Sequence, residues 1–275
     1  MVSTRTDALD LNAVAAEVAS SLTGHRQVPP FSCSAGGLSL ADAYRVTSLL
    51  RAAFEARAEK IIGRKIGFTN RRMWTAHGVR APIWGYCTDR TIYELESTPF
   101  RRASDFVEPR IEPEIMFGLG KAPMPDMDES ELLECIDWLA LGYEIVQSIF
   151  PGWRFAAADA VAANALHGAL VIGNRHAFAP RKTAWQHELG TFTVELHCDG
   201  RLSQRGGGAL VLDSPLRALH HLVELLANDP HNPPLCAGEI ISTGTLTLAT
   251  PISAGETWTT RVRGIALENI TLRLA

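Results

Sequence analysis

The sequence predicts an α+β fold in which a mixed β architecture, either a rolled sheet or an incomplete barrel, follows a smaller N-terminal helical region. Two patterns support this prediction. Helical apolar spacing dominates before residue 60, whereas the C-terminal half consists largely of short alternating segments between Gly-containing turns. With 275 residues, 46% of them hydrophobic, the chain can bury a sizeable core. We expect residues 1–75 to form the helical region leading into the fold and residues 76–275 to form the main β domain.

Capping signals and apolar spacing predict four main helices. Asp128 and Glu131 form a capping box for the third helix, and Gly142 is placed to end it. This third helix would deliver Glu144 just beyond its C-terminus. The predicted helices are residues 8–22, a stronger helix starting near Ser39, residues 128–141 and residues 214–227.

Short strands are predicted between these helices and beyond them. The glycine-flanked segment 63–70 has the pattern of a strand that enters a loop. Residues 191–197 alternate between apolar and polar side chains and end at Asp199-Gly200, a hairpin signal. Gly-Glu turns at residues 238–239 and 255–256 each precede another strand. Many short strands with few helices favour the mixed β architecture.

Three glutamates are the strongest functional signal in the chain. Glu112 and Glu114 would share one face of a strand because side chains alternate along a strand. Glu144 lies in an apolar segment, where an ionised carboxylate is costly unless it is paired or bound to a metal. Three convergent carboxylates suit Mg²⁺ or Mn²⁺. The alternative interpretation is that the first two belong to a solvated strand face and the third to a buried salt bridge.

Composition limits the classes of partner and compartment. The net charge of −4 and the pI near 6.1 argue against a nucleic-acid or anionic-membrane partner. No segment has the length of apolar sequence that a membrane span needs, and no secretory signal is apparent. The cysteines lack CxxC spacing and are odd in number, which argues against disulfides or a thiolate zinc site. A cytoplasmic protein is therefore expected. The cysteines are Cys33, Cys87, Cys135, Cys198 and Cys236.

Several motifs together resemble those of the fumarylacetoacetate hydrolase superfamily, and most closely its 2-keto-4-pentenoate hydratase and 4-oxalocrotonate decarboxylase branch. The resemblance extends from about Ser39 to the C-terminus and implies a β-roll that forms the catalytic domain. The motifs that carry it are GRKIGFT (63–69), PIWG (82–85) with Asp89, RIEPE (110–114), Glu144 and STG (242–244).

The resemblance implies a divalent metal, usually Mg²⁺, bound by Glu112, Glu114 and Glu144. Such a metal chelates a 2-keto or enol acid and stabilises its enolate. Lys65 matches the family lysine that holds the substrate carboxylate or assists proton transfer, and a surface lysine is the alternative. Asp89 matches a family acid near the site, although an aspartate that caps a turn is an equal possibility.

Four further positions match family residues that approach the substrate. Asn164 corresponds to the asparagine of a Val-Ala-Asp-Asn-Ala motif, and Gly207 lies in a Gly-rich loop, for which an ordinary turn is the alternative. Thr243 and Gly244 match a Thr-Gly pair whose hydroxyl and N–H can bind the substrate carboxylate.

The chain also departs from the family pattern at several positions, so the resemblance indicates the type of chemistry and not a particular substrate. The acid before Asn164 is replaced by Ala163, and a small polar residue is replaced in Leu166-His167. Ile149 stands in place of an arginine, and residues 212–215 read Leu-Asp-Ser-Pro where the family has Leu-Gly-His-Pro. These positions surround a metal set that is itself intact.

The leading hypothesis is therefore a Mg²⁺-dependent lyase of aromatic catabolism that hydrates a 2-hydroxydienoate. Decarboxylation of an oxalocrotonate-like diacid is an alternative, for which Arg71 and Arg72 could attract the second carboxylate or be merely exposed. Hydrolysis of acylpyruvates is another, with His77 or His167 as base. A non-catalytic protein that binds metal or keto acid is the third. The resemblance also implies a homo-oligomer.

Overall fold

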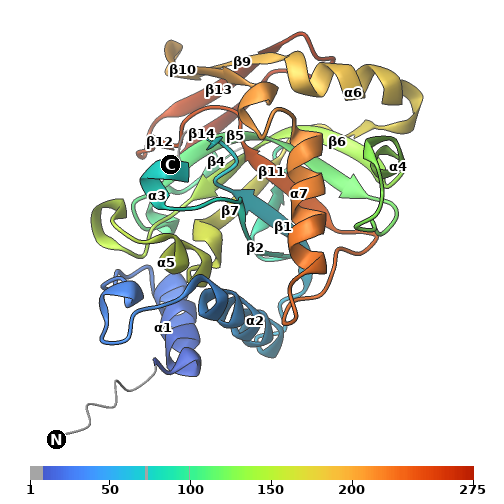
Figure 1. Cartoon of the computed structure of the whole chain (residues 1–275). Helices are drawn as coiled ribbons and strands as arrows, with labels where there is room; N and C mark the ends of the chain where they lie inside the picture. Colours follow the sequence, from blue (N-terminus) through green and yellow to red (C-terminus); the bar gives the residue numbers. More distant parts are fainter. Residues whose placement is uncertain (1–8, 72–73, 99) are drawn as a thin grey trace, which may run out of the picture.

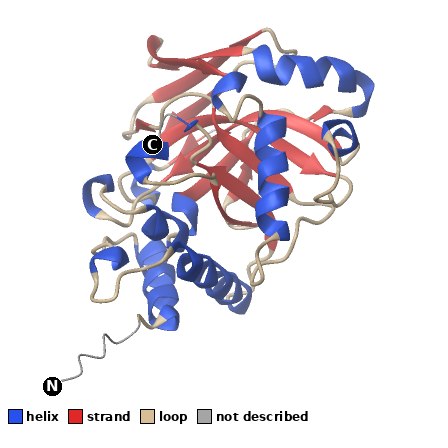
Figure 2. Cartoon of the chain, viewed as in Figure 1, coloured by secondary structure: helices blue, strands red, loops and turns tan. Residues whose placement is uncertain are grey.

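Strands occupy the middle of the molecule and helices lie around them (Figures 1 and 2). The computed structural model describes residues 9–71, 74–98 and 100–275. The predicted α+β fold with few helices is confirmed. The helices are α1 (Leu11–Gly24), α2 (Leu40–Ala56), α3 (Trp74–His77), α4 (Glu129–Leu133), α5 (Ala157–Ala162), α6 (Lys182–Thr191) and α7 (Pro215–Ala227), joined by short 3₁₀ turns.

A large mixed sheet forms the centre of the fold. Its strands are β1 (Ile61–Gly67), β2 (Ile83–Thr88), β3 (Ile92–Glu94), β5 (Arg110–Leu119), β6 (Ile136–Val146), β7 (His167–Ile172), β8 (His176–Ala177), β11 (Ile240–Thr245) and β12 (Thr250–Pro251). The strand order is β2-β1-β11-β5-β6-β7-β3, with β12 beside β5 and β8 beside β6. The strands β5 and β6 are antiparallel and run side by side through the middle of this sheet, so their side chains are largely buried.

A second, smaller sheet lies at the top of Figure 1, beside α6. Its strands are β4 (Phe100–Arg101), β9 (Thr193–Cys198), β10 (Arg201–Gly207), β13 (Thr257–Arg263) and β14 (Ile270–Leu274), in the order β10-β9-β13-β14-β4. The predicted hairpin at Asp199-Gly200 joins β9 to β10, since Asp199 and Gly200 both adopt positive φ angles. The Gly-Glu turns likewise precede β11 and β13 as predicted.

Both N-terminal helices begin at a capping side chain, of which only Ser39 is expected from the sequence. The Asp10 carboxylate accepts hydrogen bonds at the start of α1, and the Ser39 hydroxyl accepts one from the Asp42 amide at the start of α2. These two helices pack against each other, and α2 also contacts α5 and β2 (Figure 1). Strand β1 follows α2 directly and lies within the large sheet. A division into regions 1–75 and 76–275 remains a prediction.

The helix predicted over residues 128–141 is wrong beyond its first turns. The capping box of Asp128 and Glu131 forms, but α4 ends at Leu133 and the chain enters β6 at Ile136. In β6 the backbone pairs with β5 on one side and with β7 on the other. These two pairings stabilise the strand more than apolar spacing alone stabilises a short helix. Gly142 lies inside this strand rather than at a helix end. A Cβ at this position would meet the carbonyl oxygen of Val171 at 2.6 Å, so the close approach of β7 requires glycine here.

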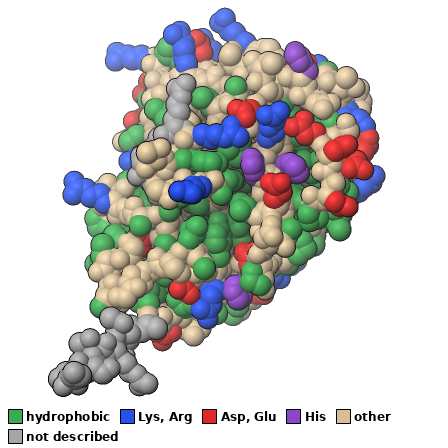
Figure 3. Space-filling model, viewed as in Figure 1, with side chains coloured by type: hydrophobic (Ala, Val, Ile, Leu, Met, Phe, Trp, Pro, Cys, Tyr) green, Lys and Arg blue, Asp and Glu red, His purple; other side chains and the backbone are tan. Residues whose placement is uncertain are grey.

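The fourth predicted helix agrees with the structure. Ser214 caps α7 and Pro215 occupies its first position, and the helix packs its apolar face against β11. Among the described helices, none has the length and apolar character needed to cross a membrane. On the face drawn in Figure 3, basic and acidic side chains are interspersed over the surface.

Candidate metal centre

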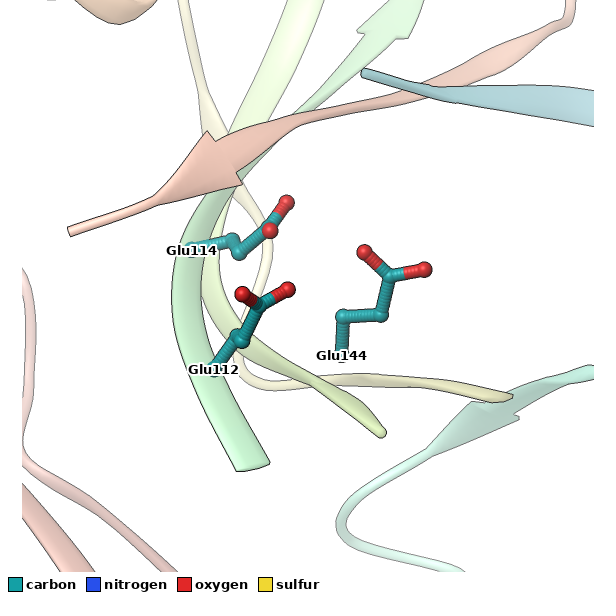
Figure 4. A group of neighbouring side chains, drawn as sticks. All are labelled: Glu112, Glu114 and Glu144. Carbon is teal, nitrogen blue, oxygen red and sulfur yellow. The ribbon is translucent and has the colours of Figure 1, made fainter. Parts of the chain in front are cut away.

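Strand pairing brings the three glutamates together. Glu112 of β5 is directly opposite Glu144 of β6, and Glu114 lies two residues further along β5 on the same face. Each offers a carboxylate oxygen, and these oxygens all lie within 4.8 Å of one another. Figure 4 shows the three side chains converging on one point. The register between β5 and β6 therefore brings the three carboxylates together.

The environment of these carboxylates fits a hard divalent cation. Glu114 and Glu144 are fully buried, and Glu112 is partly exposed. Burial raises the pKa of Glu112 to about 7, with the Glu144 charge adding to the shift and Lys65 opposing it. Burial and the two neighbouring carboxylates raise the pKa of Glu114 as well. Glu114 Oε1 has no hydrogen-bond partner among the described residues. A Mg²⁺ or Mn²⁺ ion would supply the missing positive charge and use this free oxygen.

Lys65 brings a cationic side chain into direct contact with this cluster. It is almost fully buried on β1, and its Nζ lies 3.0 Å from Glu144 Oε2 and donates a hydrogen bond to the Ala165 carbonyl oxygen at 3.0 Å. Burial opposes the charged form, but the negative charges of Glu144, Glu112 and Glu114 outweigh it, so the pKa of Lys65 is raised. Lys65 is therefore buried beside the glutamates, which excludes the alternative of a surface lysine.

The predicted STG motif supports the metal centre from β11. The Ser242 hydroxyl and the Gly244 amide both donate hydrogen bonds to Glu114 Oε2. Gly244 has a φ of 103° and its Cα faces the Thr69 side chain, so a Cβ at this position would collide. The Thr243 hydroxyl donates instead to the Ile115 carbonyl oxygen and is buried. In this structure, Ser242 and Gly244 position Glu114, and Thr243 ties β11 to β5.

A histidine that sequence analysis named only as a possible base also contacts the centre. His167 is buried, with Nδ1 2.8 Å from Glu144 Oε1 and Nε2 2.9 Å from the Thr91 hydroxyl. Such contacts orient a ligating carboxylate. The one signal in the sequence was that His167 replaces a small polar family residue. The side chain of His77, the other possible base, lies outside the described structure.

The side chain of Asn164 is already hydrogen-bonded at both ends to the protein backbone. Its side-chain amide donates to the Tyr86 carbonyl oxygen and its carbonyl accepts from the Tyr86 amide. Asn164, Ala165 and Leu166 all have positive φ angles, a conformation that costs energy for residues other than glycine. The Asn164 bridge to β2 holds this turn, which presents the Ala165 carbonyl to Lys65.

Two predicted site residues lie elsewhere. Asp89 is exposed at the end of β2, where its carboxylate accepts a hydrogen bond from the Lys60 amide, so its role here is to fix a turn. Gly207 ends β10 and donates its N–H to the Leu246 carbonyl oxygen, and a Cβ on it would collide with the Phe192 carbonyl. Neither is among the described residues that line the cavity beside the metal centre. The structure therefore gives no support to a catalytic Asp89 or a substrate-binding Gly207.

A cavity of about 330 Å³ opens next to the three glutamates. Lys65 and Glu112 line its inner end. Its walls are mostly apolar, so a bound substrate would be shielded from water. The wall residues include Phe68, Val146, Trp153, Phe155, Leu166 and Leu248.

The raised pKa values predict how metal and pH act together on stability. The folded metal-free protein binds protons at Glu112 and Glu114 that the unfolded chain has released above about pH 4.5. The contribution of these two groups to stability is therefore fully present below that pH, and the contribution of Glu112 is lost as pH rises through about 7. Because Mg²⁺ binds deprotonated ligands, we expect it to raise the melting temperature more at pH 8 than at pH 5.5.

This prediction is checked by thermal unfolding in EDTA and in excess Mg²⁺ at the two pH values. KCl at matched ionic strength controls for charge screening. An equal Mg²⁺-induced shift at both pH values would contradict protonation of the ligand set.

Comparisons with protein families and with known proteins show what this chain is similar to. Residues 63–271 match the family model described as "Fumarylacetoacetate (FAA) hydrolase C-terminal". A 2-hydroxyhexa-2,4-dienoate hydratase from Comamonas testosteroni is 29% identical over 245 residues, which cover 89% of this chain and 90% of that protein. A 4-oxalocrotonate decarboxylase from Pseudomonas sp. (strain CF600) is 30% identical over 230 residues, covering 83% of each chain.

Solved structures agree with these sequence matches. The 4-oxalocrotonate decarboxylase from Pseudomonas putida G7, complexed with magnesium and adipate, superposes with a TM-score of 0.86 at 26% identity, covering 96% of this chain and 97% of that one. The same enzyme has also been solved with calcium and acetate, with a TM-score of 0.85. A fumarylpyruvate hydrolase from Pseudomonas aeruginosa shares the fold at 13% identity and a TM-score of 0.54.

Proposed function

Because this chain belongs to the fumarylacetoacetate hydrolase family and carries three convergent buried carboxylates, we propose that it is a Mg²⁺-dependent lyase acting on 2-hydroxydienoate or 2-keto acid intermediates of aromatic catabolism. The observation that carries the proposal is the set of Glu112, Glu114 and Glu144 beside an apolar cavity with a buried lysine. Hydration is the leading reaction, as in the named hydratase relatives. Mn²⁺ is the alternative metal.

The chemistry follows from the charges at the inner end of the cavity. Glu112, Glu114 and Glu144 would hold Mg²⁺, and the ion would supply a Lewis acid for negative charge that develops on the C2 oxygen of a 2-keto or enol acid. Lys65 provides an ammonium beside the same point, where it can hold a substrate carboxylate or transfer a proton. Ser242, Gly244 and His167 fix the carboxylates, so little reorganisation is needed as charge develops.

Decarboxylation of a 4-oxalocrotonate-type diacid is the second candidate, and a specific observation favours it. The structural match with a TM-score of 0.86 is a 4-oxalocrotonate decarboxylase. When CO₂ leaves, the electron pair of the broken C–C bond stays on the substrate as an enolate, so Lys65 would provide the same positive charge in both reactions, and a bound metal ion the same Lewis acidity. Hydrolysis of acylpyruvates requires a base that activates water, and His167 is already engaged by Glu144 and Thr91. A protein that binds keto acids without turnover is the remaining alternative.

The test is ultraviolet turnover of 2-hydroxypenta-2,4-dienoate and 2-oxohex-3-enedioate by EDTA-treated protein, with and without Mg²⁺. We expect Mg²⁺ to restore loss of at least one chromophore, and product analysis then distinguishes hydration from decarboxylation. Inertness toward both compounds despite measurable Mg²⁺ binding would reject the lyase and leave acylpyruvate hydrolysis or a binding role.

Two further properties belong to the same proposal. We expect a homo-oligomer, as the family resemblance implies. We also place the enzyme in the reducing cytoplasm, since its five cysteines are free.

A further inference from the structure

A second cavity, of about 480 Å³, is separated from the cavity of the metal centre by the turn at residues 164–167. Ala165 and Leu166 line the cavity beside the glutamates, whereas Asn164 and His167 line the second one. No described residue lines both cavities. The volume lies within the range of about 300–1,000 Å³ that is typical of small-molecule pockets. The second cavity is therefore a candidate site of its own.

Three arginines line this second cavity together with two carboxylates. Arg57 is paired with Glu59, with 2.8 Å between Nη2 and Oε1. Among the described residues, Arg90, Arg101 and Asp105 form no ion pair, although all three line the cavity. Two free arginines against one free carboxylate leave one positive charge in excess. A ligand with a single negative charge would therefore neutralise the cavity.

Arg101 is the best placed of these cations to bind an anion. Its Cζ lies 3.8 Å from the centre of the Tyr93 ring and 5.9 Å from that of Phe106, so the guanidinium is held over aromatic faces. Its Nε is buried and finds no hydrogen-bond partner among the described residues, which is costly for an N–H group. A guanidinium presents its donors in a planar fork that matches a carboxylate. The geometry therefore favours a carboxylate as the missing partner.

The rest of the wall is suited to an apolar body rather than to further polar groups. The rings of Phe54, Tyr93 and Phe106 line the cavity near the free arginine. The two amide side chains in the wall are already engaged, because Gln147 bonds to the Val107 amide and the His167 carbonyl, and Asn164 bonds at both ends to Tyr86. Aromatic walls pack well against a flat ring.

We infer that this second cavity binds a small aromatic carboxylate, whose carboxylate is received by Arg101 and whose ring packs among Phe54, Tyr93 and Phe106. The site is distinct from the metal centre and does not depend on the proposed reaction. His167 lines this cavity and also contacts Glu144, so a bound acid would lie one side chain away from a metal ligand.

The test is isothermal titration of the Mg²⁺-loaded protein with three probes, namely benzoate, benzyl alcohol and inorganic phosphate. Benzyl alcohol keeps the ring and lacks the charge, and phosphate keeps the charge and lacks the ring. We expect benzoate to bind at least about tenfold more tightly than either, as one charge-assisted hydrogen-bonded pair or one packed ring provides.

Two variants then locate the binding site. Arg101→Met keeps an unbranched side chain to pack on Tyr93 and should weaken benzoate binding at least about tenfold. Arg90→Met changes an exposed side chain, so this variant is expected to fold, and it should weaken binding by about two- to fivefold.

Matched controls remove arginines elsewhere. Arg110 lines the cavity of the metal centre, with its Cζ 4.0 Å over the Trp153 ring, so Arg110→Met makes the same change on the other side of the turn. Arg71→Gln removes an exposed arginine that pairs with Asp213. Both controls should leave benzoate affinity unchanged. Arg72, the other arginine that the sequence offered for a second carboxylate, lies outside the described residues.

The contrary outcomes are distinct from one another and from failure of the proposed function. No binding of benzoate to the native protein, or full binding in both Arg101→Met and Arg90→Met, would overturn the inference. Loss of binding in Arg110→Met alone would place benzoate at the metal centre and overturn it as well. Phosphate that binds more tightly than benzoate and depends on Arg101 would exclude an aromatic ligand. None of these results alters Mg²⁺-dependent turnover, which tests the proposed function separately.

Discussion

Replacing Glu112 with alanine is expected to abolish Mg²⁺-dependent turnover while the fold stays intact. Glu112 is directly opposite Glu144 in the strand register and faces the cavity. Removing a residue that only hydrogen-bonds to a metal ligand commonly weakens metal binding about 10- to 100-fold. Loss of a ligand itself should therefore weaken Mg²⁺ binding by more than about 100-fold. Isothermal titration with Mg²⁺ measures this loss directly.

The stability of the same variant gives an independent readout. Because burial raises the pKa of Glu112, its ionised form is unfavourable in the metal-free protein. Glu112→Ala should therefore melt in EDTA at the native temperature or above it, but lose the Mg²⁺-induced increase. Glu96→Gln, at an exposed position, is the matched control and should bind Mg²⁺ normally. Unchanged Mg²⁺ affinity in Glu112→Ala would remove this residue from the ligand set.

Replacing Lys65 with methionine should separate metal binding from catalysis. The methionine side chain fills much of the same space, but the three carboxylates lose their cationic partner. We expect the metal-free variant to be less stable by about 3–5 kcal/mol, as is typical when one member of a buried ion pair is removed. Mg²⁺ should bind at least as tightly as in the native protein, because a competing positive charge 3.0 Å from Glu144 is gone.

Turnover by the Mg²⁺-loaded Lys65→Met protein should nevertheless fall by a factor of about 10²–10⁴, the range for a positioned proton-transfer group. Steady-state kinetics with the substrate identified by ultraviolet turnover measures this effect. Lys121→Met, at an exposed position, provides the matched control for charge removal. Native turnover in Lys65→Met would exclude a catalytic role, and loss of Mg²⁺ binding would show that Lys65 acts by maintaining the centre.

Local physics alone predicted several parts of the fold and the centre. Side-chain alternation places Glu112 and Glu114 on one face, and the cost of a buried charge marks Glu144 as unusual. Capping residues located the starts of α2 and α7, because a cap depends on residues within one turn of the chain. The family motif located Lys65, whose side chain an isolated strand pattern would leave on the surface.

Local patterns failed where partners distant in the sequence decide the outcome. Residues 136–141, predicted as the end of a helix, form part of β6 because β5 and β7 flank them, although their apolar spacing also suits a helix. Asp89 matches a family acid in the sequence, yet the end of β2 turns it toward the Lys60 amide and away from the cavity. The tertiary structure also places His167 of β7 against Glu144 of the neighbouring strand β6.

The sequence by itself therefore determined the α+β class, the N-terminal helices and the identity of the three carboxylates. The tertiary structure alone decided that these carboxylates converge, since the register of β5 against β6 is set by pairing along both strands. It also decided that Lys65 lies against Glu144, because Lys65 belongs to β1, which β11 separates from β5 in the sheet. Side-chain type and spacing are local properties of a chain, whereas charge compensation in a buried site depends on every element that packs around it.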